Sequence, residues 1–186
     1  LKLKDEDVLL KMKNQMKAEQ PVRKYYHGKY YGYIFLVYSQ KLSEDLVKQG
    51  CFINKTYTLL FPNLDKSLQS HFIRGYFDGD GSLGIDTRFT RSRINFTSAS
   101  PKFLEQLRAI LSLLCGTKGS LLKESKSNAW HLRYGGKHAA IILNWLYKDA
   151  TIFMKRKHDK FLIYKSVHIK QGELLETPNI ELDENN

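Results

Sequence analysis

Apolar residues recur at helical spacing in the middle of the chain, and the period changes abruptly near residue 82. Leu64, Leu68, Phe72, Gly75 (with Tyr76) and Gly79 recur at three- or four-residue steps, which places them on one face of an α-helix. From Ser82 onward apolar and polar residues alternate, as they do in a half-buried β-strand. The pattern therefore predicts a helix from about Leu64 that leads directly into a strand beginning at Ser82.

The two halves of the chain repeat the same order of predicted elements at an offset of about 95 residues. In each half an amphipathic helix precedes two strands with aromatic alternation, a second helix and a short apolar segment near lysines. These helices and strand pairs fall at residues 8–16, 22–38 and 42–50, and at 103–111, 119–134 and 139–147. Asp5 and Ser100 precede the first helix of each half and are predicted N-caps.

The end of the helix predicted from Leu64 carries a specific sequence. Residues 72–82 read Phe-Ile-Arg-Gly-Tyr-Phe-Asp-Gly-Asp-Gly-Ser. Together with the preceding apolar stripe, this segment resembles the signature of the LAGLIDADG homing endonucleases, in the variant with glycine before the last acid. The resemblance implies that Asp80 is a divalent-metal ligand and that the carbonyl of Gly79 helps to hold the metal. It also implies that a second helix packs against Gly75.

The position of Asp80 at the end of the predicted helix agrees with a bound cation. A carboxylate at a helix C-terminus opposes the helix dipole at a cost of about 0.3–1 kcal/mol, which a divalent ion would offset. Asp78 lies roughly 200° around the helix from Asp80, so we expect it to cap or pair locally. Asp-Gly-Asp-Gly is also common in simple turns. A calcium loop is excluded, because the glycine and glutamate that it needs are replaced by Leu83 and Phe89.

The resemblance and the repeat together predict an α+β fold of tandem αββαββα units. Antiparallel sheets would form a saddle with helices on its convex side. We expect a first, N-terminally incomplete half at residues 1–62, a second half with the motif at 63–170, and an acidic tail at 171–186.

The family pattern places a first motif helix and strand before Leu1, where this sequence has none. Three explanations stay open: truncation, a partner helix from another polypeptide, or loss of half of the active site. Without a second helix, the apolar stripe of the motif helix would be partly exposed. An intact chain would be a pseudo-dimeric monomer. A homodimer through the single motif is less favoured, because one chain already carries two predicted sheets.

The charge of the chain is unevenly distributed. All 30 basic residues lie at or before Lys170, whereas five of the 19 acidic residues follow it, so residues 1–172 carry a formal charge of +16. Such a body suits nucleic acid, with an affinity that falls as salt rises. The acidic tail would discourage non-specific binding. No long, basic, amphipathic helix is predicted, which disfavours a membrane surface.

The cysteines and histidines indicate neither a disulfide framework nor a zinc site. Cys51 and Cys115 each lie beside apolar residues, as buried thiols of an intracellular, reducing compartment do. The six histidines are scattered without metal-ligand spacing, and the longest apolar runs are too short to span a bilayer.

A sheet whose other face is covered by helices can place its polar face in the major groove of DNA. Arginine reads guanine there and asparagine reads adenine. The candidates in the second half are Arg88, Arg91, Arg93, Asn95, Thr97, His131 and Arg133, and those in the first half are Lys2, Lys4, Arg23, Lys24 and Lys29. A merely solvated sheet face is the alternative.

Five tyrosines bracket the turn at His27 and Gly28. They are Tyr25, Tyr26, Tyr30, Tyr31 and Tyr33. We favour packing across a hairpin over stacking on unpaired bases.

The sequence as a whole predicts a site-specific endonuclease, associated with an intron or an intein, that hydrolyses double-stranded DNA with Mg²⁺. Phosphodiester cleavage needs a barrier reduction of about 20 kcal/mol, which favours metal ions over isolated side chains. The resemblance also implies basic side chains near the metal, for which Lys157 and Lys55 are the candidates. The alternative is a catalytically inactive DNA- or RNA-binding descendant, such as a splicing cofactor with an RNA intron as partner.

Overall fold

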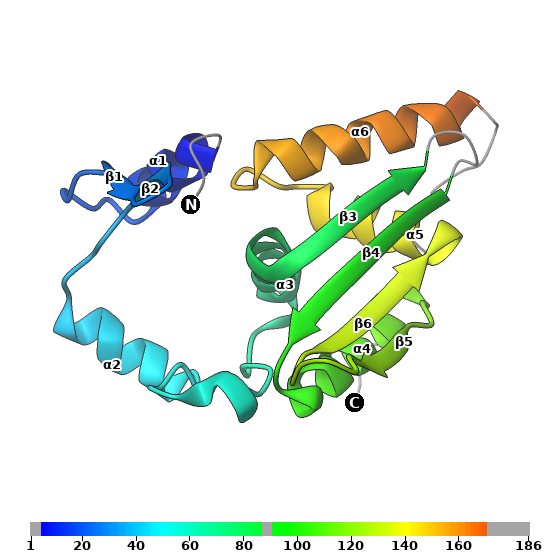
Figure 1. Cartoon of the computed structure of the whole chain (residues 1–186), viewed down its shortest axis with the longest axis horizontal. Helices are drawn as coiled ribbons and strands as arrows, with labels where there is room; N and C mark the ends of the chain where they lie inside the picture. Colours follow the sequence, from blue (N-terminus) through cyan, green and yellow to red (C-terminus); the bar gives the residue numbers. More distant parts are fainter. Residues whose placement is uncertain (1–4, 87–90, 171–186) are drawn as a thin grey trace.

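A computed structural model describes residues 5–86 and 91–170 of the chain (Figure 1). Its N-terminal part consists of α1 (Glu6–Gln15), β1 (Arg23–His27), β2 (Tyr30–Ile34), α2 (Gln40–Lys48) and the short 3-10 helix η2 (Lys55–Tyr57). Its C-terminal part consists of α3 (Lys66–Asp80), β3 (Gly81–Asp86), β4 (Arg91–Ser98), α4 (Pro101–Cys115), β5 (Ser120–Lys123), β6 (Trp130–Gly135), α5 (Gly136–Tyr147) and α6 (Lys155–Lys170).

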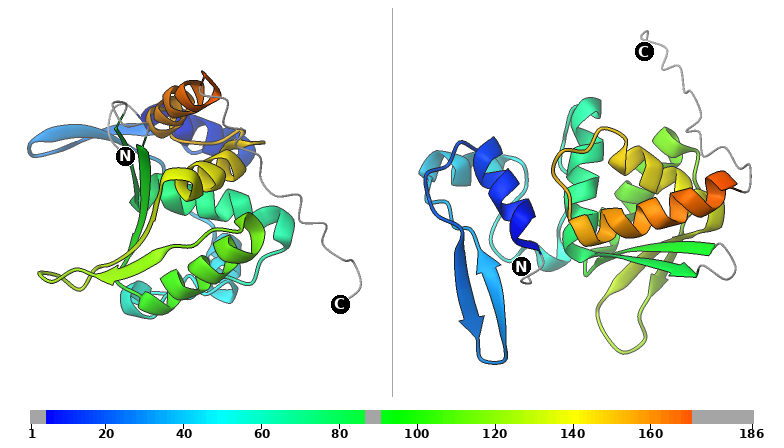
Figure 2. Two further views of the ribbon diagram at one scale, coloured as in Figure 1. Left: turned by 90° about the vertical axis from the view of Figure 1, so that its right-hand side faces the viewer. Right: turned by 90° about the horizontal axis from the view of Figure 1, so that it is seen from above.

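The C-terminal part is built on a four-stranded antiparallel sheet with the strand order β3-β4-β6-β5. Helices α3, α4 and α5 cover one face of this sheet and leave the other face open, as the left view of Figure 2 shows. The elements from α3 to α5 follow the order αββαββα, so the predicted α+β class and repeat unit are confirmed. The junction is also close to its prediction, since α3 ends at Asp80 and β3 begins at Gly81.

The core lies between the sheet and its helices. Helix α3 contributes Ile73 and Phe77, both fully buried, and the sheet contributes Ile94, Phe96 and Leu132. The predicted alternation is therefore observed, since apolar residues of β4 and β6 face the helices while Arg93 and Arg133 are exposed.

The apolar stripe predicted for α3 divides between two surroundings. Phe72 and Tyr76 pack edge-on or tilted against Phe103 of α4. Leu68 is instead exposed, as are Gly75 and Gly79 at the end of the stripe. The face of α3 that is buried against the sheet is centred on Ile73 and Phe77, which the stripe did not include. Because α3 contacts both the sheet and other helices, periodicity alone does not show which of its faces is buried against the sheet.

The N-terminal part repeats the element order of the C-terminal part but has little core of its own. The order α1-β1-β2-α2 corresponds to α4-β5-β6-α5, as the repeat predicted. Helix α1 buries Val8 and Leu9, whereas α2 buries no residue. The hairpin β1–β2 forms a separate sheet that projects on the open side of the larger sheet (Figure 2). Tyr26 and Tyr31 pair across it with ring centroids 4.9 Å apart, so the predicted cross-strand packing is confirmed.

The two predicted N-caps behave differently. The hydroxyl of Ser100 accepts a hydrogen bond from the backbone N–H of Phe103 and caps α4. Asp5 occupies the N-cap position of α1 but makes no side-chain cap. Its buried carboxylate instead accepts hydrogen bonds from Arg156 Nε at 3.1 and 3.4 Å. Asp5 thus ties α1 to the start of α6, a partner that its local sequence could not indicate.

The second half closes with a longer element than the short apolar segment that we predicted. Helix α6 spans 16 residues and buries Lys157, Phe161 and Tyr164 against the domain. Cys115 is buried and Cys51 half-buried, and both are free thiols. Among the described residues, no helix combines the length and apolarity needed to cross a bilayer.

Candidate active site at the end of helix α3

Helix α3 delivers its last two acids to opposite environments. Asp80 is exposed at the C-terminal end of the helix. Asp78 is only 6 % exposed, and its carboxylate accepts hydrogen bonds from Tyr147 Oη at 3.1 Å and from the backbone N–H of Met154 at 2.8 Å. The expected local pairing of Asp78 is therefore wrong, because its partners lie about 70 residues away. Burial raises the pKa of Asp78, and the hydrogen bond from Met154 and the charge of Lys157 partly oppose this rise.

A buried arginine one turn before Asp78 supports the same region. Arg74 donates through Nε to the carbonyl oxygen of Ile152 and through Nη1 to that of Leu146, both at 2.9 Å. Its Nη2 lies 2.7 Å from His71 Nδ1. Burial lowers the pKa of Arg74, while the nearby Asp78 raises it. We did not predict Arg74 as a functional residue. The available signal was its i, i+4 spacing to Asp78 within an otherwise apolar helix.

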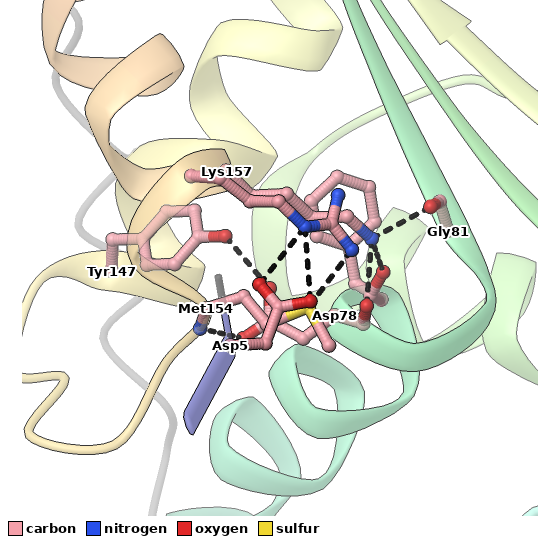
Figure 3. Close-up of polar contacts among 8 residues, drawn as sticks. Asp5, Asp78, Gly81, Tyr147, Met154 and Lys157 are labelled. Atoms are coloured by element: carbon pink, nitrogen blue, oxygen red, sulfur yellow. Dashed lines mark hydrogen bonds and ion pairs between the residues drawn. The ribbon is translucent and has the colours of Figure 1, made fainter. Parts of the chain in front are cut away.

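The end of α3 is closed by a lysine from α6. Lys157 is 4 % exposed, and its ammonium donates to the carbonyl oxygens of Phe77, Asp78 and Gly81, the last two at 2.9 and 2.6 Å (Figure 3). A cation at a helix C-terminus interacts favourably with the dipole. The ammonium of Lys157 therefore already offsets part of the unfavourable interaction between the Asp80 carboxylate and the helix dipole. Burial lowers the pKa of Lys157 to about 8.

The turn from α3 into β3 leaves no room for a side chain at Gly81. A Cβ atom there would lie 2.5 Å from the carbonyl oxygen of Phe77 and still closer to the Phe77 ring. Gly81 can take part in this close approach because it has no Cβ. The glycine after Asp80 is thus a packing requirement of the junction, which we had not singled out from the sequence.

Asp80 opens onto a cavity of about 500 Å³ that it shares with Lys55. Its lining also includes Tyr76 of α3 and Thr97 and Ser98 of β4. Lys55 begins η2 directly after Asn54, which has the left-handed φ of 62°. Non-glycine residues in this region are uncommon, and asparagine is among those that tolerate it. The structure therefore brings together two of the predicted catalytic residues, Asp80 and Lys55, from the two halves of the chain.

The donors at Asp80 suit Mg²⁺ but form an incomplete set. Mg²⁺ binds carboxylate and carbonyl oxygens, often through only one or two carboxylates supplemented by water and substrate phosphates. Asp80 offers an exposed carboxylate, and Gly79 is exposed beside it. Within residues 5–86 and 91–170, no group of three His, Cys, Asp or Glu side chains is positioned to hold a metal. The chemistry of these donors fits the ion, and further ligands would have to come from water, substrate or another segment.

Gly75 faces a groove and is not packed directly against a second helix. The groove has a volume of about 840 Å³ and runs between α1 and α3. Its lining includes Leu68, Gly75 and Gly79 from α3 and Val8 and Met12 from α1. A Cβ atom added at Gly75 or Gly79 would meet no atom within 4 Å. The predicted packing surface of α3 is therefore open among the described residues.

Five of the predicted DNA-reading residues of the second half lie in described parts of β4 and β6, the two central strands of the sheet: Arg93, Asn95, Thr97, His131 and Arg133. Register pairs Asn95 with Arg133 and Thr97 with His131. Asn95 Nδ2 donates to Thr97 Oγ1 at 3.1 Å, and both side chains lie within 3.2 Å of His131 Nδ1. Arg93 is exposed on the same strand as Asn95. The face of the sheet that carries these residues thus presents two exposed arginines around a hydrogen-bonded polar centre.

The first-half candidates lie on the separate hairpin. Arg23 and Lys24 belong to β1, and Lys29 lies in its turn. The Lys24 ammonium sits 4.5 Å from the centroid of the Tyr31 ring. Of Arg91 only the backbone is described, as part of β4. The remaining candidates, Lys2, Lys4 and Arg88, lie outside the described residues.

Comparison with known proteins agrees with this geometry. Residues 67–144, which run from α3 into α5, match the family model of the LAGLIDADG-like domain. The chain therefore contains a LAGLIDADG-like domain, with Asp80 and the α3–β3 junction inside the matched segment. Among curated protein sequences, none matches the chain.

Two kinds of solved structure share the fold. The meganuclease I-SmaMI, solved bound to uncleavable DNA, is 12% identical, with a TM-score of 0.59 over 93% of this chain and 79% of that one. The N-terminal LAGLIDADG domain of DUF199/WhiA is 16% identical, with a TM-score of 0.51 over 82% of this chain and 69% of that one. At such identities the likeness establishes the fold. The match to I-SmaMI extends beyond the family-model segment into the N-terminal part.

Proposed function

We propose that the chain is part of a site-specific endonuclease that hydrolyses double-stranded DNA with the help of Mg²⁺. The observation that carries this proposal is the position of Asp80, exposed at the end of α3 in a cavity that also contains Lys55. The matched LAGLIDADG-like domain and the likeness to a meganuclease solved with DNA support it.

In this function Asp80 and the carbonyl of Gly79 would hold the ion. Bound Mg²⁺ supplies activation of a water molecule and stabilisation of the leaving oxygen. Lys55 places a positive charge beside Asp80, where it would counter the negative charge of a scissile phosphate. The remaining acid would come from a second helix seated on α3 in the groove at Gly75, either from the same polypeptide or from a partner.

DNA would lie across the open face of the sheet. Exposed Arg93 and Arg133 are available for guanine or phosphate, and Asn95 for adenine. The formal charge of +16 over residues 1–172 would draw the polyanion to this face. The hairpin β1–β2, with Arg23 and Lys24, would extend the contact on the other side of Asp80.

A cleavage assay tests the proposal. Supercoiled plasmid is incubated with the protein and Mg²⁺, and the nicked and linear products of the wild type and the Asp80→Asn variant are compared. Asp65→Asn is the matched control, because Asp65 is an exposed acid at the opposite end of the same helix. We expect Mg²⁺-dependent cleavage by the wild type and by Asp65→Asn, and at least a hundredfold loss in Asp80→Asn. Equal cleavage by all three proteins would remove Asp80 from the reaction.

A second function follows from the incomplete ligand set. Within the described residues no group of three His, Cys, Asp or Glu side chains could hold a metal, which suits a nucleic-acid-binding protein that no longer cleaves, such as an intron-splicing cofactor. Binding of duplex DNA and of structured RNA at matched salt distinguishes the two functions. Tighter binding to RNA, together with no cleavage of DNA, would favour the splicing cofactor.

A further inference from the structure

The ammonium of Lys157 has no hydrogen-bond donor left for a substrate. A lysine ammonium carries three N–H donors and no acceptor. In the structure all three are engaged by backbone carbonyl oxygens, those of Phe77, Asp78 and Gly81 (Figure 3). The side chain is also 4 % exposed. Lys157 is therefore poorly placed to contact a water molecule or a phosphate, which is the role the resemblance suggested for it.

The three carbonyls stand on both sides of Gly79 and Asp80. Two belong to the last turn of α3, where carbonyl groups lack helical partners, and the third belongs to the first residue of β3. The carbonyl of Phe77 also accepts a hydrogen bond from the backbone N–H of Gly81. One ammonium thus joins the end of the helix to the start of the strand around the two residues that would bind metal.

The same junction is fixed by packing. The Phe77 ring is fully buried, and its centroid lies 4.7 Å from the Lys157 ammonium. Gly81 approaches that ring too closely to admit a Cβ atom. A change in the direction of the chain at Asp80 would therefore have to displace Phe77 from the core or Lys157 from its carbonyls.

We propose that Lys157 is a positioning residue, whose buried ammonium holds the α3–β3 junction so that the Asp80 carboxylate and the Gly79 carbonyl keep a fixed orientation relative to each other. The part of this proposal that concerns metal rests on the proposed function. The proposal gives different roles to the two lysines that the sequence suggested as catalytic residues. Lys55 lines the cavity beside Asp80, whereas Lys157 acts behind Asp80, through the backbone.

Amide hydrogen exchange tests the positioning role without metal or DNA. Lys157→Met keeps the length of the side chain and removes its donors. Lys160→Met makes the same change three residues later on α6, at an exposed position beside the same junction. We expect amides of residues 79–83 to exchange at least tenfold faster in Lys157→Met, with α4 and β6 unchanged, and no local effect in Lys160→Met. Equal exchange at residues 79–83 in the wild type and Lys157→Met would overturn the proposal.

Binding of Mn²⁺ separates positioning from simple electrostatics. Removal of a nearby positive charge would by itself tighten the binding of a cation at Asp80. Loss of a fixed ligand geometry would weaken it, and we expect about tenfold weaker binding of Mn²⁺ by Lys157→Met in a titration followed by electron paramagnetic resonance. Tighter binding than in the wild type would contradict the positioning role.

Two further variants keep the outcomes distinct. If Lys157→Met does not fold, Lys157→Gln retains an amide donor, and the same exchange and Mn²⁺ criteria apply to it. Asp80→Asn serves as the reference for Mn²⁺ binding. If the wild type and Asp80→Asn bind Mn²⁺ equally, the proposed function fails, while the exchange rates at residues 79–83 still decide whether Lys157 holds the junction.

Discussion

Two glycines of the same motif, Gly75 and Gly81, should respond in opposite directions to replacement by alanine. Gly75 lies within α3, and a Cβ atom there meets nothing within 4 Å. Alanine is favoured over glycine in a helix by about 0.8–1 kcal/mol, so Gly75→Ala should stabilise the protein by up to that amount. Gly81→Ala would press a methyl group into the ring and carbonyl oxygen of Phe77. Overpacking of this kind costs about 1–3 kcal/mol.

Thermal unfolding of the two variants measures this difference. For a chain of this size, 1 kcal/mol shifts the Tm by about 2–4 °C. We therefore expect Gly75→Ala to unfold above the wild type by up to about 2–4 °C, and Gly81→Ala at least about 2 °C below it. Urea unfolding of the same proteins supplies the free energies at 25 °C, and unchanged m-values would show that the unfolded states are comparable.

The stability change of either variant could contradict these expectations. If Gly75→Ala destabilises the protein by more than about 1 kcal/mol, a cost typical of overpacking, another surface already packs closely on Gly75 in solution. If Gly81→Ala is neutral, the junction is not as tight as the structure shows, and the fixed orientation of Asp80 loses its support. In an assembly that supplies the second helix, Gly75→Ala should reverse its effect and weaken association.

Other predictions concern buried charges and DNA. Between about pH 8 and 10.5 the unfolding free energy should rise with pH, because Lys157, whose pKa is lowered to about 8, loses its proton in the folded state first. Lys157→Met should remove up to about 1.4 kcal/mol per pH unit of this slope, measured by urea unfolding across that range. Asp78→Ala should destabilise the protein by about 1–3 kcal/mol, because it leaves the buried Tyr147 hydroxyl and the Met154 N–H without their acceptor, and an unchanged Tm would contradict this. Arg93→Ala or Arg133→Ala should lower the slope of log affinity for DNA against log salt by about 0.9 if the side chain contacts a phosphate, while an unchanged slope with altered sequence preference would indicate a base contact.

The parts of the site that sequence could predict are those encoded locally. The change of period from helix to strand occurs within a few residues, so the positions of Asp80 and of the α3–β3 junction followed from the residues around them. The angular separation of Asp78 and Asp80 on one helix also indicated that they lie on different faces, whereas the burial of Asp78 was not predicted. The partners of these residues did not follow, because Tyr147, Met154 and Lys157 lie between 69 and 80 residues away along the chain.

The internal repeat likewise predicted some features of the N-terminal part and missed others. It predicted the element order of the N-terminal part from the C-terminal one, because helical and strand periods are local properties. It did not predict that α2 would bury no residue, or that Asp5 would bind Arg156 instead of capping α1. These features depend on which surfaces are available for packing, and the N-terminal part has no counterparts of β3 and β4 within the described residues.

The most direct test of the account is to locate a metal ion crystallographically. Crystals of the protein with duplex DNA and Mn²⁺ would reveal the ion through its anomalous scattering. We predict a peak within coordination distance of the Asp80 carboxylate and the Gly79 carbonyl oxygen, next to a phosphate, and no such peak in Asp80→Asn. A peak that persists in Asp80→Asn, or Mn²⁺ bound only away from the end of α3, would contradict the account.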